Sequence, residues 1–281
     1  MTSEWTQIAD RCYLRRYADW NVNVTVVEAA GGVLLVDTRG TQDQGRELRE
    51  HVRALTATPV RWVVNTHVHF DHTFGNIAFD ECQIWAHENA VAALGDHLDY
   101  LKELVAADPD DDPLDAAVVS TQLRFPDRTM SSVAALDLGD RFVELVHPGR
   151  GHTDGDLVVN VPDADLLLAG DLIEELAAPS YGPDCWPLDW PAALDVLIGS
   201  VPRTTVIVPG HGSVVDREFV ESQRQLVADV AQIVHEFAAA RTPVDAAVND
   251  TRWPSGDRPL SESSRRQALV RGYATIGIAP V

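Results

Sequence analysis

Three of the ten histidines in this chain lie within six residues, in the segment "NTHVHFDHTFGN" at 65–76. His67 and His69 alternate along the chain, so their side chains project to the same side of an extended segment. Asp71 and His72 follow directly. Neutral imidazoles and carboxylates are ligands that Zn²⁺ takes in proteins. The cluster therefore predicts one part of a metal site.

Three further candidates lie downstream, each next to a glycine and a predicted strand. His152 lies in "PGRGHTDGD", Asp171 ends the strand-like run in "LLLAGDLI", and His211 follows a strand in "VIVPGHGS". Glycine allows the backbone to approach a site closely. With the first cluster these residues make five histidines and two aspartates, which is a full ligand set for two metal ions.

The elements that must position these residues can be predicted from hydrophobic periodicity. Residues 108–132 have no clear period and are expected to form a loop or a lid. The two strands that flank the Gly-Gly turn at 31–32 are expected to pair as a hairpin. Strands are predicted at 21–29, 31–38, 60–66, 83–87, 141–147, 157–161, 165–170 and 204–208. Helices are predicted at 43–57, 88–107, 190–200 and 216–240, with a weaker helix near 262–273.

The order "THVHFDH", "GHTDGD", "LLLAGD", "PGHG" resembles the metallo-β-lactamase-fold superfamily of binuclear hydrolases, over about residues 20–215. The resemblance implies an α/β fold, a four-layer αβ/βα sandwich with two mixed sheets and outer helices. It places the metals at the common edge of the two sheets. We expect residues 1–240 to form the hydrolase domain and residues 241–281 to form a C-terminal extension packed on the same domain.

The resemblance also implies a role for each candidate ligand. His67, His69 and His152 resemble the ligands of a first metal, and Asp71, His72 and His211 resemble those of a second. Asp171 resembles the carboxylate that bridges both metals, and Asp37 in "LLVDT" matches a structural aspartate that orients the metal loop or a ligand imidazole. The expected cofactors are two divalent ions, Zn first, with Fe or Mn also suited to an oxygen-rich second site.

The expected reaction is hydrolysis of an ester, thioester, lactone or lactam of a small molecule by a metal-bridging hydroxide. Asp71 is expected to orient the nucleophile as well as bind metal. With Asp171 as bridge, the ligand set is more similar to glyoxalase-II-type thioesterases and lactonases than to dedicated β-lactamases. The basic residues that bind glutathione in a true glyoxalase II are not recognisable in the C-terminal region.

Aromatic residues near the motifs are candidate substrate-binding walls, namely Phe70, Phe74, Tyr181 and Trp186. The remaining histidines lie outside the motifs and are expected to have ordinary structural roles; these are His51, His87, His97, His147 and His235.

Charge and composition restrict the classes of molecule that we expect this chain to bind. The net charge is −21, with 43 acidic and 22 basic residues, and such a field repels nucleic acid and anionic lipid. We therefore expect a small-molecule substrate and no nucleic-acid or membrane partner.

The N-terminal segment does not read as a secretory signal, so a cytoplasmic location is expected. The three cysteines are widely spaced and are expected to be thiols rather than ligands. The oligomeric state is not indicated.

Three alternatives stay open from the sequence. One is a mononuclear iron dioxygenase of sulfur compounds with the same fold, which leaves part of the ligand set unused. Another is a nuclease of the same fold, against which the acidic charge weighs. The last is a non-catalytic binding module, although degenerate relatives lose ligands whereas all seven are present in this chain.

Overall fold

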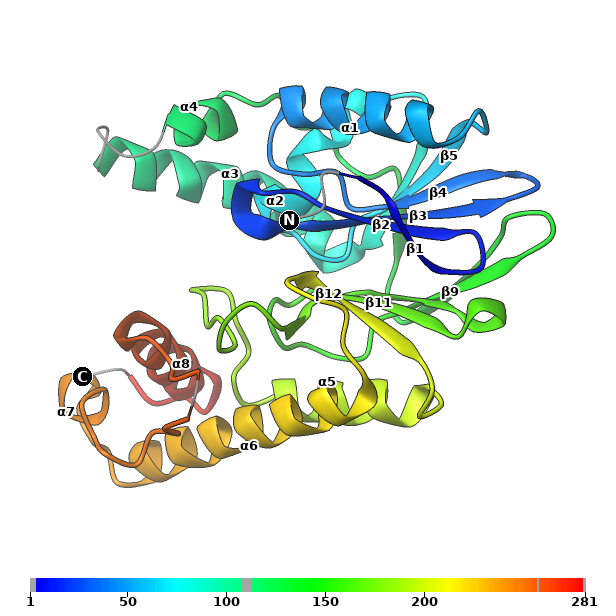
Figure 1. The fold of residues 1–281 in the computed structure, drawn as a ribbon. Helices are drawn as coiled ribbons and strands as arrows, with labels where there is room; N and C mark the ends of the chain where they lie inside the picture. The colour runs from blue at the N-terminus through cyan, green and yellow to red at the C-terminus, as the bar shows by residue number, and fades with distance from the viewer. Residues whose placement is uncertain (1–3, 108–112, 257, 280–281) are drawn as a thin grey trace.

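Two β-sheets lie face to face, and helices cover the outer side of each (Figure 1). The computed structural model describes residues 4–107, 113–256 and 258–279. One apolar cluster joins the facing sides of the sheets, with Leu34 from the first and Leu168 from the second. The predicted four-layer αβ/βα sandwich with two mixed sheets is confirmed.

Within the described residues the first sheet has seven strands, which lie in sequence order. Strands β1 to β4 pair antiparallel and β4 to β7 pair parallel. The predicted hairpin is confirmed, because β3 and β4 pair antiparallel up to Ala29 and Gly32. The strands are β1 (Thr6–Ala9), β2 (Cys12–Arg16), β3 (Asn23–Ala29), β4 (Gly32–Val36), β5 (Val60–Val64), β6 (Gln83–His87) and β7 (Arg128–Met130).

The second sheet has the order β12-β11-β10-β9-β8 in the part of the chain that is described. Only its β11–β12 pair is parallel. Its strands are β8 (Val133–Asp137), β9 (Phe142–Val146), β10 (Val158–Val161), β11 (Leu166–Glu174) and β12 (Val206–His211).

Helix α1 shows how the sequence builds the outer layers. The side chain of Thr41 accepts a hydrogen bond from the backbone N of Gln44 at 3.1 Å and caps the helix, and Leu48 and Val52 are buried against the first sheet. Helices α5 and α6 cover the second sheet in the same way. The α-helices are α1 (Gln42–Leu55), α2 (Phe70–Thr73), α3 (Glu88–Ala107), α4 (Pro113–Val119), α5 (Trp190–Ser200), α6 (Arg217–Ala239), α7 (Val244–Ala247) and α8 (Glu262–Thr275), with 3₁₀ turns η1 (Asp19–Asn21), η2 (Phe74–Phe79) and η3 (Pro162–Ala164).

Two predictions about local structure need correction. Residues 108–132 are not simply a loop or lid, because α4 and β7 fall within this range; residues 108–112 lie outside the described part. Asp171 does not end its strand, because β11 continues to Glu174. The pairing of β11 with β12 shifts register around Gly170, whose φ of +53° favours glycine, and it resumes where Glu174 pairs with His211.

The C-terminal extension packs on the second helical layer. Trp253, Leu260, Leu269 and Tyr273 share an apolar cluster with residues of α5 and α6. Figure 1 shows α7 and α8 beside one end of α6, on the side of the molecule toward which α3 and α4 also reach. The described part of the extension therefore continues the helical layer that α5 and α6 form.

The three cysteines are free thiols. Cys12, Cys82 and Cys185 are buried and unlinked, and none belongs to a group of candidate metal ligands among the described residues. No described helix combines the length and apolar character that a bilayer span requires.

Candidate metal centre

All seven predicted ligands meet at the common edge of the two sheets. His67 and His69 lie in the loop after β5, and Asp71 and His72 lie in α2, which follows it. The second sheet supplies the other three: His152 from the loop after β9, Asp171 from β11, and His211 from the end of β12. Each sheet thus contributes part of both candidate metal positions.

The first candidate position is formed by three histidines and Asp171. One ligand atom from each of His67, His69, His152 and Asp171 lies within 4.8 Å of the others. The closest approach among the imidazoles joins His152 Nε2 and His69 Nδ1 at 3.0 Å. Two imidazole nitrogens this close share a proton in the metal-free protein, and with both lone pairs free they are suited to bind one cation.

The second candidate position is formed by Asp71, His72 and His211, whose ligand atoms also lie within 4.8 Å of one another. His211 Nε2 lies 3.2 Å from His72 Nε2 and 3.2 Å from Asp71 Oδ2. This position has a carboxylate of its own, whereas the first has three imidazoles.

Asp171 lies between the two positions. Its Oδ2 is 3.7 Å from His67 Nε2 and 3.5 Å from His152 Nε2, on the side of the first position. On the side of the second, Oδ1 is 3.4 Å from His72 Nε2 and Oδ2 is 3.2 Å from His211 Nε2. One carboxylate therefore reaches both groups of ligands.

Two inward-facing atoms of the candidate ligands lack hydrogen-bond partners, as expected of atoms that bind a metal. His67 Nε2 and Asp171 Oδ1 are buried and have no hydrogen-bond partner among the described residues. Buried polar groups are normally hydrogen-bonded, so two such atoms aimed into one cluster of imidazoles and carboxylates indicate ligand atoms. The donor set of nitrogen and oxygen atoms suits Zn²⁺ and other divalent ions of the first transition row.

The comparison with known families agrees with this geometry. A family model described as the metallo-beta-lactamase superfamily matches residues 17–216, which include all seven candidate ligands. The chain belongs to the metallo-β-lactamase superfamily. The resemblance inferred from the four motifs is therefore confirmed.

Individual relatives within the superfamily differ in their activities. The type 2 metallo-beta-lactamase of Bacillus cereus is 28% identical over 197 residues, which cover 69% of this chain and 68% of that protein. The human acyl-coenzyme A thioesterase MBLAC2 is 28% identical over 153 residues, or 53% of this chain and 54% of that protein. A solved metallo-beta-lactamase from Pontibacter korlensis has the same fold, with a TM-score of 0.63, 23% identity, and coverage of 80% of this chain and 99% of that one.

Asp37, the predicted structural aspartate, lies directly behind the superfamily's metal loop. Its Oδ2 is 2.8 Å from His72 Nδ1, and its Oδ1 accepts a hydrogen bond from the backbone N of Thr66 at 2.8 Å. Thr66 Oγ1 also donates to Asp37 Oδ2 at 2.9 Å. Asp37 therefore orients His72 through one oxygen and fixes the start of the loop through both.

Each of the other ligand histidines has a polar atom of another residue near the nitrogen that faces away from the cluster, an arrangement that is general for metal-bound histidine. His211 Nδ1 lies 2.8 Å from the Trp20 carbonyl oxygen, and His67 Nδ1 lies 3.0 Å from Thr66 Oγ1. The inward atoms are then His67 Nε2, His69 Nδ1, His72 Nε2, His152 Nε2 and His211 Nε2.

The metal-free cluster binds protons strongly. Burial alone would lower the pKa of His72, but the charges of Asp171, Asp71 and Asp37 raise it to about 9. Burial likewise opposes protonation of His152, while the hydrogen bond to Glu174 and the charge of Asp171 raise its pKa to about 10. Protons thus occupy the site as substitutes for a cation, and metal binding must displace them.

Sequence reasoning missed three residues at this site. Asp184 Oδ2 lies 3.0 Å from His69 Nε2, and Glu174 Oε1 lies 3.3 Å from His152 Nδ1. His97, which was expected to have an ordinary structural role, stacks on His69 with ring centroids 5.1 Å apart. Asp184 is a lone acidic residue in a loop, and such a residue gives no sequence signal of its partner.

Only some of the aromatic residues predicted to contact the substrate reach the surface. Phe70 is half-buried and contacts Trp20 edge to face at 4.9 Å between centroids. Phe74 and Tyr181 are only 1% and 3% exposed, so both lie in the core and offer no surface to a substrate; their predicted role as walls is corrected. Trp186 is half-buried beneath the guanidinium groups of Arg150 and Arg271, 3.7 and 5.1 Å from its ring.

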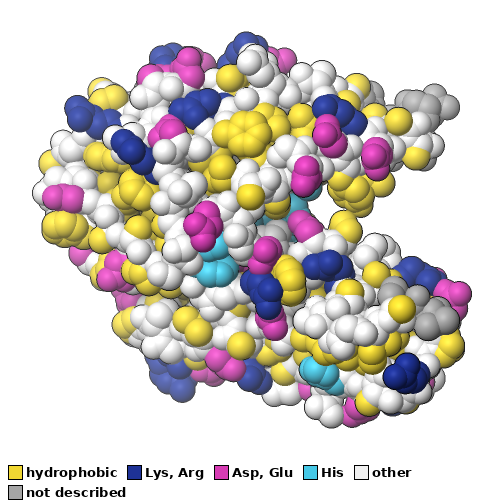
Figure 2. Space-filling view, turned by 180° about the vertical axis from the view of Figure 1, so that it is seen from behind, with side chains coloured by type: hydrophobic (Ala, Val, Ile, Leu, Met, Phe, Trp, Pro, Cys, Tyr) yellow, Lys and Arg dark blue, Asp and Glu magenta, His cyan; other side chains and the backbone are white. Residues whose placement is uncertain are grey.

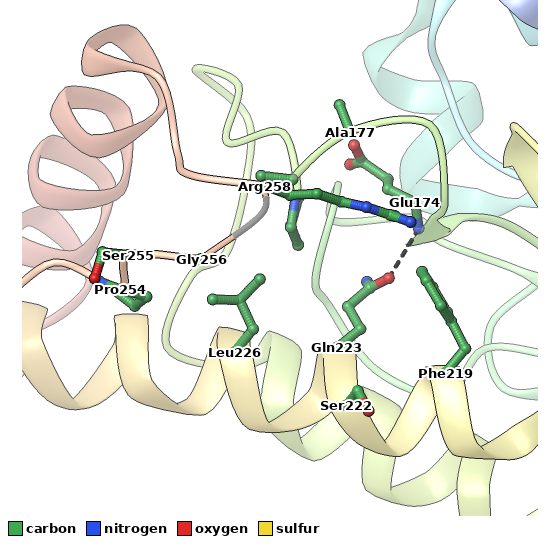
Figure 3. Close-up of a pocket in the computed structure, with 12 residues that line it drawn as sticks. Glu174, Ala177, Phe219, Ser222, Gln223, Leu226, Pro254, Ser255, Gly256 and Arg258 are labelled. Atoms are coloured by element: carbon green, nitrogen blue, oxygen red, sulfur yellow. Dashed lines mark hydrogen bonds between the residues drawn. The ribbon is translucent and has the colours of Figure 1, made fainter.

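The candidate metal centre lies in a recess, and a second cavity lies near it. Figure 2 shows histidine side chains in a recess with acidic side chains beside it. A separate cavity of about 340 Å³ adjoins Glu174 and is lined mainly by apolar side chains, including Phe219 and Leu226 of α6 (Figure 3). Glu174 therefore contacts both this cavity and the ligand His152.

Proposed function

We propose that this chain is a dinuclear metal-dependent hydrolase that cleaves an ester, thioester, lactone or lactam of a small molecule. The observation that carries the proposal is that two three-residue ligand groups meet at one shared carboxylate, Asp171. A single metal would leave one of these groups without a cation. The proposed ions are Zn²⁺, with Fe or Mn as the other candidates for the oxygen-rich second position.

Two bound ions would supply a hydroxide nucleophile at neutral pH and polarise the substrate carbonyl. The chain's own residues define where the substrate enters. The side chains of His69 and His211 are 18% and 17% exposed, whereas those of His67, His72 and His152 are exposed by 5% or less. The substrate therefore reaches the centre between His69 and His211.

We propose Asp71 as the residue that orients the nucleophile. Its Oδ2 lies 3.2 Å from His211 Nε2, so it adjoins one side of this entrance. Burial raises the pKa of Asp71, but the charge of His72 and the hydrogen bond to His211 lower it well below the usual range. Asp71 is thus ionised at neutral pH, and its carboxylate can accept a hydrogen bond from the attacking water and orient it.

Two of the relatives support acyl-group hydrolysis but do not select one substrate. One is named for β-lactams and another for acyl-coenzyme A thioesters. The half-buried pair of Phe70 and Trp20 lies beside the entrance and offers an apolar contact. We propose a small molecule rather than nucleic acid or a membrane as the partner, because the net charge is −21. The cytoplasmic location stays a prediction.

A hydrolysis screen tests this function. The panel holds a chromogenic β-lactam, an aryl ester, a thioester and a lactone, each with wild-type protein, protein treated with a chelator, and the Asp71→Ala variant. We expect at least one class to be hydrolysed by wild type and by neither control. Absence of hydrolysis with metals loaded would reject the proposal, and dioxygen uptake by protein with one Fe per chain would favour the sulfur-compound oxygenase.

A further inference from the structure

The segment between β11 and α5 passes beside the first metal position and brings two carboxylates to it. Glu174 is the last residue of β11, and Asp184 lies in the loop that leads to α5. Their partners, His69 and His152, belong to the same candidate position and approach each other to 3.0 Å. Two carboxylates from one segment therefore support one pair of ligands.

Asp184 fixes the ring of His69. The contact between Asp184 Oδ2 and His69 Nε2 is 3.0 Å, which is hydrogen-bond distance. A hydrogen on Nε2 leaves Nδ1 as the free lone pair, and Nδ1 is the atom that faces His152. On another side His97 stacks on the same ring with an interplanar angle of 30°. His97 is itself held, because its Nε2 accepts a hydrogen bond from the backbone N of Phe70 at 3.2 Å.

Glu174 forms an ion-pair contact with the outer nitrogen of His152. Its Oε1 lies 3.3 Å from His152 Nδ1 and also accepts a hydrogen bond from the backbone N of Ser180 at 2.9 Å. The backbone N of Glu174 donates to Gln223 Oε1 at 3.0 Å, the bond drawn in Figure 3. Glu174 is therefore held at both its backbone and its carboxylate, and His152 is left with Nε2 toward the metal.

The two positions obtain their negative charge differently. The second has Asp71 as a direct carboxylate ligand and Asp37 on the outer nitrogen of His72, while the outer nitrogen of His211 contacts a neutral carbonyl, that of Trp20. The first has three imidazoles and only the shared Asp171. Asp184 and Glu174 place negative charge beside the outer nitrogens of His69 and His152. This charge makes the two imidazoles stronger electron donors to a bound metal.

We propose that Asp184 and Glu174 are positioning residues for the first metal ion, each fixing the tautomer and orientation of one ligand histidine. The inference rests on the proposed dinuclear site and adds residues outside the predicted ligand set. Loss of either carboxylate, with the side-chain volume kept, weakens the first position about 10- to 100-fold and leaves the second unchanged.

The test measures metal affinity rather than turnover. Metal-free wild type, Asp184→Asn and Glu174→Gln are titrated with Zn²⁺ against a chromogenic chelator of known affinity. The matched controls are Asp189→Asn in the same loop, whose carboxylate contacts Arg150, and Glu175→Gln, whose carboxylate contacts Arg258. We expect one of the two dissociation constants to rise about 10- to 100-fold in each test variant and in neither control.

The same substitutions made in an Asp71→Ala protein identify which metal position they affect. In the Asp71→Ala protein the second position is removed, so the remaining ion occupies the first. Adding Asp184→Asn or Glu174→Gln must then weaken the binding of that ion. Thermal unfolding of the metal-free variants checks that the fold is kept, since a purely structural role would lower this stability as well. Two bound Zn²⁺ in wild type with unchanged affinities in both test variants would overturn the inference, whereas no bound Zn²⁺ in wild type would reject the proposed function itself.

Discussion

Gly210 lies directly against the carboxylate of Asp171: a Cβ built on Gly210 would be 1.8 Å from Asp171 Oδ1. No real side chain tolerates such a contact, so the parallel strands β11 and β12 can carry a bridging carboxylate at this point only if β12 has a glycine there. The "PGHG" motif thus has two functions, because it supplies His211 and leaves room for Asp171.

Gly210→Ala should therefore displace the carboxylate that both positions share. A shift of about 1 Å in a catalytic group costs on the order of 100-fold in rate, and we expect kcat/KM to fall at least that far, with fewer than two ions retained per chain. Gly199→Ala is the matched control, because a Cβ at Gly199 meets nothing within 4 Å. A Gly210→Ala enzyme with wild-type metal content and rate would show that Asp171 is not the bridge.

Asp71→Ala should separate the two metal positions. Its carboxylate is the only acidic side chain in the second ligand group besides the shared Asp171. We expect the variant to keep one ion per chain and to lose turnover, because it lacks both a ligand and the group that orients the nucleophile. Metal analysis and steady-state kinetics on the same preparation check this. Normal metal content together with normal turnover would remove Asp71 from the mechanism.

Asp37 should matter for stability as well as for metal binding. It is buried, bonds His72 and Thr66, and has a φ of +66°, a conformation that Asp and Asn adopt more readily than other non-glycine residues. Asp37→Asn loses the charge and should lower the free energy of unfolding by about 1–3 kcal/mol. Asp37→Ala should cost more, since it adds backbone strain and leaves the backbone N of Thr66 without its partner. Chemical denaturation of both variants measures the difference, and equal stabilities of wild type and Asp37→Ala would contradict it.

The metal-free protein should lose stability as the pH rises. His72 and His152 have folded-state pKa values raised to about 9 and about 10 from 6.5 in an unperturbed chain. The folded protein then binds protons that the unfolded chain has released, so their contribution is complete below pH 6.5 and is lost as the pH rises through 9 to 10. Urea denaturation of chelator-treated protein at several pH values measures this trend. A free energy of unfolding that rises across the same range would contradict the assignment of these protonated imidazoles.

The seven candidate ligands could be found from the sequence because each lies in a short motif within or next to a strand. His67, His69, Asp71 and His72 are neighbours in sequence, and glycines next to His152, Asp171 and His211 show where backbone must pack closely. The ends of apolar strands then place these motifs at one sheet edge. Local pattern and the general rule for strand ends were sufficient for this part.

The outer residues could not be found in this way, because their partners are distant in sequence. Asp184 and His69 are separated by 115 positions, and Glu174 reaches His152 only because β11 continues past its predicted end. Burial of Phe74 and Tyr181 also depends on which elements pack over them, and aromatic residues look alike in sequence whether they line a pocket or fill a core. Such contacts follow from the tertiary fold and not from any local pattern.

Metal content tests the central claim most directly. The protein is purified without added metal, analysed for metals per chain, stripped with a chelator, and then reconstituted with Zn²⁺ while hydrolysis of the best substrate from the panel is followed. The dinuclear site predicts close to two ions per chain and activity that returns only as the second ion binds. A protein that takes up no metal on reconstitution, or that hydrolyses its substrate equally well when stripped, would contradict it.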